Sequence, residues 1–140
     1  MMQFKDSGVV SEGGVHDSII QEFHFVLNEN VDICLRGPSG ECKWVSLIGV
    51  EKIGFKDVVN GLLVSDMFCW RLDVAIKQSI SSDAWRVLLA GNYVESDFQN
   101  MVSRLVEQYN SRLLVFIESS YGGSVALICG NIAWRDAVNS

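Results

Sequence analysis

Acidic side chains outnumber basic ones in this sequence. There are 17 Asp and Glu residues against 11 Lys and Arg residues, which gives a formal net charge of −6 at pH 7. No two carboxylates have a spacing diagnostic of general acid and base roles, and dispersed charges usually keep a surface soluble. If several converge on one face, they form an electronegative patch that steers a basic protein into contact. The candidate partner-binding residues for such a patch are Asp57, Asp66, Asp73 and Asp83.

Nucleophilic catalysis by Ser or Cys needs a histidine that accepts the proton. The chain has two histidines, His16 and His24. Adjacent residues point in different directions, so the run His16-Asp17-Ser18 cannot itself be a triad, and His16 is better interpreted as ordering the entry into a strand. His24 falls on the polar face of a predicted strand, where an imidazole is solvated or paired across strands. The sequence therefore predicts no catalytic residue and no enzyme.

The cysteines and glycines do not form a known metal or phosphate motif. The four cysteines are widely spaced, form no CxxC pair and lie mostly far from the histidines, so they are interpreted as reduced thiols that pack as small hydrophobes. The runs Gly37-Pro38-Ser39-Gly40 and Tyr121-Gly122-Gly123-Ser124 lack the spacing of a phosphate-binding loop and are predicted to be turns. We expect no metal and no cofactor.

Apolar and polar residues alternate with the period of strands in the first half of the chain. Strands are predicted over 19–27, 31–36 and 43–53. The first two are joined by Asn28-Glu29-Asn30 as an antiparallel hairpin, and Gly49 indicates a bulge or bend in the third. The segment 54–61 is predicted as loop. A fourth strand, with one face in water, is predicted over 62–76 with an interruption around Asp66.

Helical spacing appears in the second half. Residues 82–90 form either a short helix, capped by Ser82 and stopped by Gly91, or a strand. The clearest helix covers residues 97–109, with Ser96 and Gln99 as a capping box. Its apolar stripe consists of Phe98, Met101, Val102, Leu105, Val106 and Tyr109.

Two further segments, 112–119 and 124–134, are apolar on both faces and are predicted to be central strands joined by a tight turn at 120–123. The order of elements predicts an α+β fold with a mostly antiparallel, curved sheet of about six strands and one main helix packed on one face. The alternative is a small closed barrel built from the same strands.

A chain of 140 residues matches one domain, so residues 1–140 are assigned to a single domain. The first residues lack a secretory signal and no run is long and apolar enough to span a bilayer, so we expect a cytoplasmic protein that does not bind membranes. The negative charge and dispersed basic residues disfavour direct nucleic-acid binding and favour a basic protein partner. Mild acidity is also common in cytosolic proteins that have no such partner.

Three short motifs suggest a family. His16-Asp17-Ser18-Ile19, Ile48-Gly49-Val50-Glu51 and Ser119-Ser120-Tyr121-Gly122-Gly123 resemble features of small bacterial proteins, some of which are encoded beside toxin genes. In overall character the chain is similar to the immunity proteins of contact-dependent inhibition and related polymorphic toxin systems. This resemblance implies a small, non-enzymatic bacterial protein that binds a cognate toxin domain, commonly a basic nuclease, and blocks its active site.

Two other functions remain open. The chain could be an enzyme or small-ligand binder with a pocket between sheet and helix, with His24 or Tyr121 at the pocket edge. It could also be an interaction domain that dimerises through an exposed strand edge, so both a monomer and a homodimer are compatible with the sequence.

Overall fold

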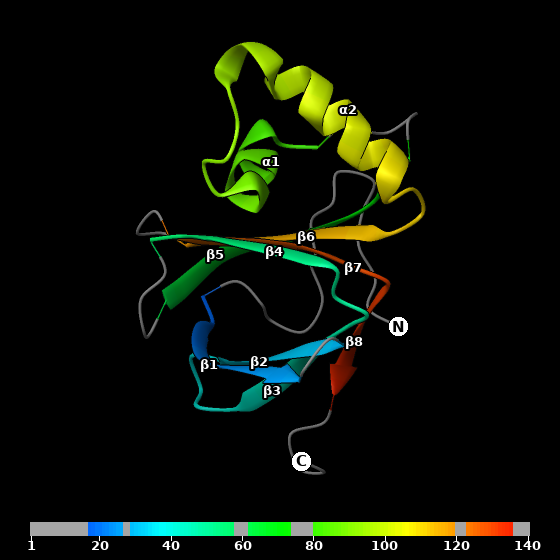
Figure 1. Ribbon diagram of the computed structural model, residues 1–140. Coiled ribbons are helices and arrows are strands. Elements are labelled where there is room, and N and C mark those ends of the chain that lie inside the picture. Colours follow the sequence, from blue (N-terminus) through cyan, green and yellow to red (C-terminus); the bar gives the residue numbers. More distant parts are fainter. Residues whose placement is uncertain (1–16, 27–28, 58–61, 74–79, 120–122, 136–140) are drawn as a thin grey trace.

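The computed structural model describes residues 17–26, 29–57, 62–73, 80–119 and 123–135 (Figure 1). The strands are β1 (Ile19–Val26), β2 (Asn30–Arg36), β3 (Cys42–Ile48), β4 (Lys52–Lys56), β5 (Leu62–Arg71), β6 (Leu113–Ser119), β7 (Ser124–Cys129) and β8 (Asn131–Arg135). The helices are α1 (Ser82–Leu89), the 3-10 helix η2 (Glu95–Asp97) and α2 (Phe98–Gln108).

All strand pairs are antiparallel and form one sheet in the order β4-β7-β6-β5-β1-β2-β3-β8. The α+β prediction is confirmed, and because the sheet is not closed the barrel alternative is wrong. Figure 1 shows the sheet folded over, so that the half β4-β7-β6-β5 lies above the half β1-β2-β3-β8. The ladder between β1 and β5 that joins the halves is short, pairing Ile19 with Leu63 and Ile20 with Leu62.

Two predicted strands are each divided at a glycine. The predicted strand 43–53 bends at Gly49, which has φ of +69°, and continues as β4. The predicted strand 124–134 is divided at Gly130, whose N–H donates to the Ile48 carbonyl at 2.8 Å. The two bends therefore lie side by side, and each one leads the polypeptide from one half of the sheet to the other. This explains why the sheet has eight strands rather than about six.

Strand β4 corrects the loop prediction for 54–61. Residues 54–56 belong to β4, and every residue of β4 pairs with β7. The local sequence does not reveal this strand because its ladder partners come from a distant segment. Residues 58–61 lie outside the described part of the chain, as do residues 74–76 of the predicted fourth strand. The interruption expected near Asp66 is confirmed as a register shift between Val64 and Asp66.

The upper half of the sheet is buried on both faces. One core fills the space between the two halves and includes Ile33, Leu47 and Leu127, each fully buried. A second core lies between β4-β7-β6-β5 and the helices. Strands β6 and β7 are buried throughout or nearly so, as predicted. At the end of the predicted fourth strand the expected alternation is observed, with Trp70 and Leu72 buried and Arg71 and Asp73 exposed. Nearer the start of this strand the same face is not wet, because Cys69 is buried in the core between the two halves of the sheet.

Helix α1 resolves the ambiguity over residues 82–90 in favour of a helix. Its N-cap is Ser81 rather than Ser82, and the Ser81 hydroxyl accepts a hydrogen bond from the Asp83 N–H at 3.2 Å. Ala90, with φ of +51°, already has the left-handed conformation that ends the helix one residue before Gly91. Helix α1 is short, and packing of its apolar face against the second core stabilises it.

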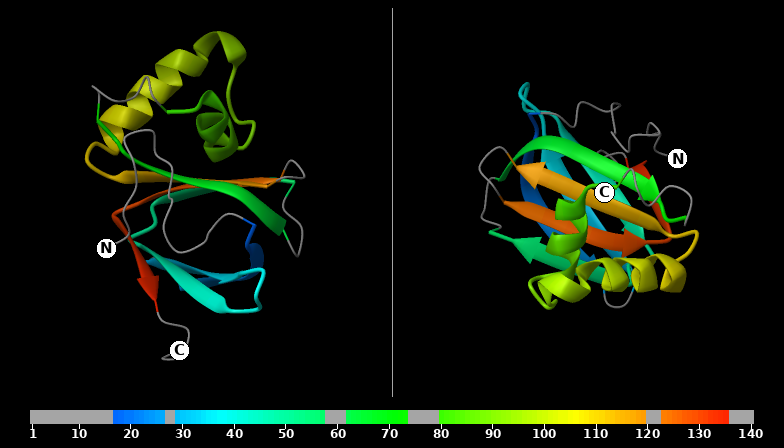
Figure 2. Two further views of the ribbon diagram at one scale, coloured as in Figure 1. Left: turned by 180° about the vertical axis from the view of Figure 1, so that it is seen from behind. Right: turned by 90° about the horizontal axis from the view of Figure 1, so that it is seen from above.

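Helix α2 forms where its apolar stripe predicts, and Phe98, Val102 and Val106 are buried. The capping box is wrong, because Ser96 lies within η2 and the N-cap residue of α2 is Asp97, whose side chain caps no backbone N–H. The Asp97 carboxylate instead accepts hydrogen bonds from Asn100 and Arg104. Both helices lie over the β4-β7-β6-β5 half, as the two views of Figure 2 show.

Candidate functional site

A row of polar side chains crosses the helix-facing side of the upper half of the sheet. Glu118 of β6 is directly opposite Asp66 of β5 and, on its other side, Ser124 of β7. Ser124 is in turn opposite Lys56 of β4. Residues opposite one another in antiparallel strands project from the same face. Two carboxylates, from Asp66 and Glu118, therefore face each other in adjacent strands.

Helix α1 completes a pocket over this row. Asp83, Arg86, Val87 and Ala90 recur at helical spacing along one side of α1 and face the ends of β4, β6 and β7. The open hollow between α1 and these strands, here called the α1 pocket, has a volume of about 610 Å³. Its lining consists of Phe55, Lys56, Asp57, Asp83, Arg86, Val87, Ala90, Gly91, Tyr93, Phe116, Glu118, Ser119 and Ser124.

Glu118 is the carboxylate that the pocket perturbs most clearly. Its pKa is raised above the ordinary value of glutamate, first by burial and then by the negative charges of Asp66 and Asp83. The ionised form of Glu118 is thus disfavoured in the folded protein. A cation brought into the pocket would relieve the repulsion among these three carboxylates.

Arg86 does not provide that cation, because its guanidinium is held elsewhere. It donates two hydrogen bonds to the Glu95 carboxylate, at 2.7 and 2.8 Å, and one to the Tyr93 hydroxyl at 3.0 Å. The guanidinium carbon also lies 4.1 Å from the centre of the Phe98 ring. The hydrogen bonds from Arg86 lower the pKa of Glu95. Arg86 therefore links α1 to η2 and forms one wall of the pocket.

The four aspartates predicted from the sequence to bind a partner do not all lie together in the structure. Asp57 and Asp83 line the α1 pocket, and Asp66 lies opposite Glu118 at its edge. Asp73 is exposed beyond the far end of β5, roughly 20 Å along the strand direction from Asp66. The structure thus brings Asp66 and Asp83 close to Glu118 and places Asp57 on the same pocket, whereas Glu118 itself is not among the residues predicted from the sequence. Its signal in the sequence is that it is the one charged residue in the apolar run 113–119.

The raised pKa of Glu118 predicts a specific pH dependence. Between the ordinary pKa of glutamate and the raised pKa, the folded protein binds more protons than the unfolded chain, so the free energy of unfolding falls as pH rises. We expect Glu118→Gln to remove this loss and to gain stability over the natural protein as pH rises from about 4 to about 8. Urea denaturation across that range measures the difference.

Glu95→Gln is the matched control with the opposite sign. The pKa of Glu95 is lowered, so its ion pair with Arg86 stabilises the fold above the ordinary pKa of glutamate and that contribution is lost as pH falls through the lowered pKa. The Glu95→Gln variant should lose stability at neutral pH. Parallel curves for both variants and the natural protein would contradict these assignments.

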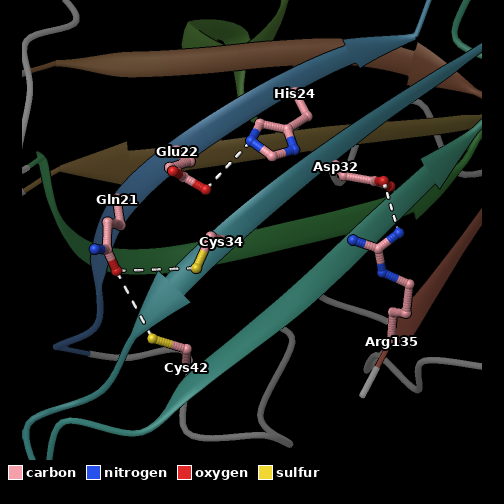
Figure 3. Close-up of polar contacts among 7 residues, drawn as sticks. All are labelled: Gln21, Glu22, His24, Asp32, Cys34, Cys42 and Arg135. Carbon is pink, nitrogen blue, oxygen red and sulfur yellow. Dashed lines mark hydrogen bonds and ion pairs between the residues drawn. The ribbon is translucent and has the colours of Figure 1, made fainter. Parts of the chain in front are cut away.

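A second group of polar contacts covers the outer face of β1-β2-β3-β8 (Figure 3). The Gln21 side-chain oxygen accepts a hydrogen bond from Arg36 at 3.1 Å and lies 3.7 Å from the Cys42 sulfur. Burial, followed by the neighbouring Cys42, raises the pKa of the Cys34 thiol to about 11, so its reactive thiolate is disfavoured. These contacts join β1, β2 and β3 and are suited to stabilising this half of the sheet.

His24 lies on the same outer face of the sheet. Its Nε2 lies 3.2 Å from the Glu22 carboxylate, and its ring packs 4.8 Å from that of Trp44, while about half of the side chain stays exposed. The exposure agrees with the solvated histidine expected from the sequence, but the carboxylate partner lies in the same strand rather than across strands. On the same face, Arg135 pairs with Asp32 at 3.1 Å (Figure 3). His16 and Tyr121 lie outside the described residues.

The four cysteines are free thiols. Cys69 and Cys129 are fully buried in strands, and burial raises the pKa of the Cys129 thiol to about 12. Within residues 17–26, 29–57, 62–73, 80–119 and 123–135, no group of three or more His, Cys, Asp or Glu side chains is placed to hold a metal ion.

Comparisons of the chain with protein-family models, curated proteins and solved structures find no match. In the part of the chain that the structure describes, no helix combines the length and apolar character needed to cross a membrane.

Proposed function

We propose that this protein is a bacterial immunity protein that binds a cognate toxin domain, a basic nuclease, and neutralises it by occupying its active site. The observation that carries the proposal is the convergence of Asp57, Asp66, Asp83 and Glu118 at one pocket. The protein acts in the cytoplasm by occupying its partner and needs no metal, cofactor or catalytic residue of its own.

Charge supports a basic partner. The chain has a formal net charge of −6, and the pKa of Glu118 is raised first by burial and then by the negative charges of Asp66 and Asp83. Enzymes that bind phosphodiesters present Lys and Arg side chains to their substrate. An acidic surface complementary to such a site attracts it over a distance and raises the rate of association.

The composition of the pocket edge also suits a protein partner. Phe55 lies in edge strand β4, lines the α1 pocket and is 41% exposed. Aromatic side chains surrounded by polar residues are typical of the parts of an interface that contribute most to affinity. The Phe55 ring packs against Phe23 on the face of β4 turned away from α1, so it places an exposed aromatic side chain beside the acidic pocket rather than inside it.

Expression in cells tests the proposed function. The C-terminal domain of the protein encoded immediately upstream would be produced from an inducible promoter, with or without this chain. We expect growth to stop without the chain and to be restored with it, and the purified pair to form a stable complex. Toxicity that the chain does not relieve, in the absence of any complex between the purified proteins, would reject the proposal.

Charge reversal tests which surface makes the contact. We expect the triple variant Asp57→Lys, Asp66→Lys, Asp83→Lys to associate with the toxin domain at least about tenfold more slowly at low salt, because it loses electrostatic steering. Stopped-flow fluorescence measures the association rate. Glu107→Lys, an exposed change on α2, is the control and should have little effect. Equal rates for the triple variant and the natural protein would contradict the assignment of this surface.

A small-ligand binder is the second candidate, and one observation favours it. The α1 pocket lies between sheet and helix and, at about 610 Å³, has the size of sites that hold small molecules. Native mass spectrometry of the purified protein distinguishes the two functions. A bound compound lost from the Glu118→Arg variant would favour the small-ligand function over the immunity function.

A further inference from the structure

We infer that Cys34 and Cys42 form an oxidation site, at which a hydroperoxide converts the two thiols into a disulfide that joins β2 to β3. The pair lies on the outer face of β1-β2-β3-β8, whereas the α1 pocket lies on the other half of the sheet (Figure 3). The inference therefore goes beyond the proposed function and does not depend on it.

The strand register brings the two cysteines to neighbouring positions. Cys34 of β2 is directly opposite Trp44 of β3. Two residues along β2, Arg36 is directly opposite Cys42. Cys34 and Cys42 thus project from the same face and are diagonal neighbours across one strand pair. Both thiols donate to the side-chain oxygen of Gln21, which lies 4.0 Å from the Cys34 sulfur and 3.7 Å from the Cys42 sulfur. The two thiols also hydrogen-bond each other, so they are already in contact.

Closing the bond requires a local movement at one strand end. Diagonal neighbours in an antiparallel pair have Cβ atoms up to about 7 Å apart, whereas a disulfide needs about 4 Å. Cys42 is the first residue of β3 and follows the turn at 37–41, in which Gly40 has φ of +88°. The end of a strand beside a turn opens more readily than its middle, so Cys42 can approach Cys34 while the rest of the ladder stays paired.

The surroundings of the two thiols assign their roles. Cys42 is partly exposed and Cys34 is 4% exposed, so a peroxide in solution reaches Cys42 first. The Cys42 thiolate attacks a peroxide oxygen and the O–O bond breaks, which gives Cys42 sulfenic acid and hydroxide. The Cys34 thiolate then attacks the sulfenic sulfur, which forms the S–S bond and releases a second hydroxide. Each hydroxide takes up one thiol proton to give water, and the two electrons lost by the sulfurs reduce the peroxide.

Cys69 and Cys129 are the internal control. Both are fully buried in the core between the two halves of the sheet. Cys69 is in β5 and Cys129 is in β7, with β6 between them, so their strands lie about 10 Å apart. These two thiols are too far apart to pair and are shielded from a peroxide in solution. Oxidation of the folded protein should therefore stop at one disulfide.

Mass spectrometry of the natural protein tests the inference. The reduced protein would be treated with hydrogen peroxide at neutral pH, alkylated in denaturant and digested. We expect a monomer that has lost two hydrogen atoms, with a disulfide between Cys34 and Cys42 and with Cys69 and Cys129 alkylated. A dithiol reductant should restore all four free thiols. Four alkylated cysteines after peroxide treatment, a disulfide between two copies of the chain, or a different pairing would each overturn the inference.

Two single variants test the roles of the thiols. In Cys34→Ser the attacked thiol has no partner, so Cys42 should accumulate as sulfenic acid, which dimedone traps. In Cys42→Ser the same treatment should give at least about tenfold less dimedone adduct, because Cys34 is buried. Equal amounts of adduct in the two variants would overturn the assignment of Cys42 as the thiol that meets the peroxide.

The pH dependence of closure tests Cys34 as the second thiol. The pKa of Cys34 is raised to about 11, first by burial, so only a small fraction is thiolate at neutral pH. With sulfenic acid formed rapidly by excess peroxide, the rate of disulfide closure should rise about tenfold for each pH unit between about 7 and about 10. Acid quenching at intervals, followed by alkylation and mass spectrometry, measures the rate. A rate that does not change with pH would overturn the role of the Cys34 thiolate.

Discussion

Gly54→Ala is expected to lower the free energy of unfolding by about 3 kcal/mol, because α1 packs directly on this residue. A Cβ atom at position 54 would overlap the carbonyl oxygen of Val87 and lie 2.8 Å from the carbonyl oxygen and 2.9 Å from the Cα of Leu88. These are backbone atoms of α1, so no side-chain rotation can relieve the overlap. The helix must move off the sheet, and urea denaturation measures the cost.

Gly130→Ala is the matched control for this variant. Its new Cβ would lie 3.4 Å from the Arg112 guanidinium nitrogen and 3.5 Å from the Ile48 carbonyl oxygen, which are ordinary contact distances. We expect the stability change to stay within about 1 kcal/mol. Similar losses in both variants would show that α1 does not depend on the close approach at Gly54.

Phe116→Ala is expected to destabilise the protein by about 4 kcal/mol. Phe116 is 1% exposed, lies in the core between sheet and helices, and stacks against Phe68 with ring centres 6.2 Å apart. Its removal leaves a cavity beneath the α1 pocket that rigid strands cannot fill by collapse. Equilibrium unfolding in urea measures the loss, and the denaturant dependence shows whether the transition remains two-state.

Phe55→Ala changes the same residue type on the opposite face of the same half of the sheet and is the control. Phe55 is 41% exposed in an edge strand and meets Phe23 edge-on with ring centres 6.0 Å apart. We expect a loss of about 1 kcal/mol. In the proposed function Phe55→Ala weakens binding of the toxin domain more than it weakens the fold. Comparable destabilisation by the two substitutions would contradict the burial difference between them.

Only part of the candidate site could be predicted from the sequence. The sequence predicts Asp57, Asp66 and Asp83 as acidic candidates, but it predicts Asp73 equally, because a charge count contains no distances. The carboxylate nearest the centre of the site, Glu118, could have been found as the lone charge in an apolar strand. The residues that lie beside Glu118 could not have been predicted, because they depend on which strands pair with β6 and in what register.

The sequence by itself determined the identity of most elements. Alternation defined β1 and β2, the apolar stripe defined α2, and runs apolar on both faces identified β6 and β7 as central strands. Such patterns are readable because neighbouring residues in a strand or helix have fixed relative directions, whatever the rest of the chain does.

Tertiary structure decided how these elements meet. The bends at Gly49 and Gly130 turn two predicted strands into four, and each bend is favourable because its partner bends beside it. Docking of α1 on Gly54 and the register that sets Asp66 opposite Glu118 likewise join residues far apart in the chain. Their free energies come from packing and ladder hydrogen bonds between distant segments, which no local pattern encodes.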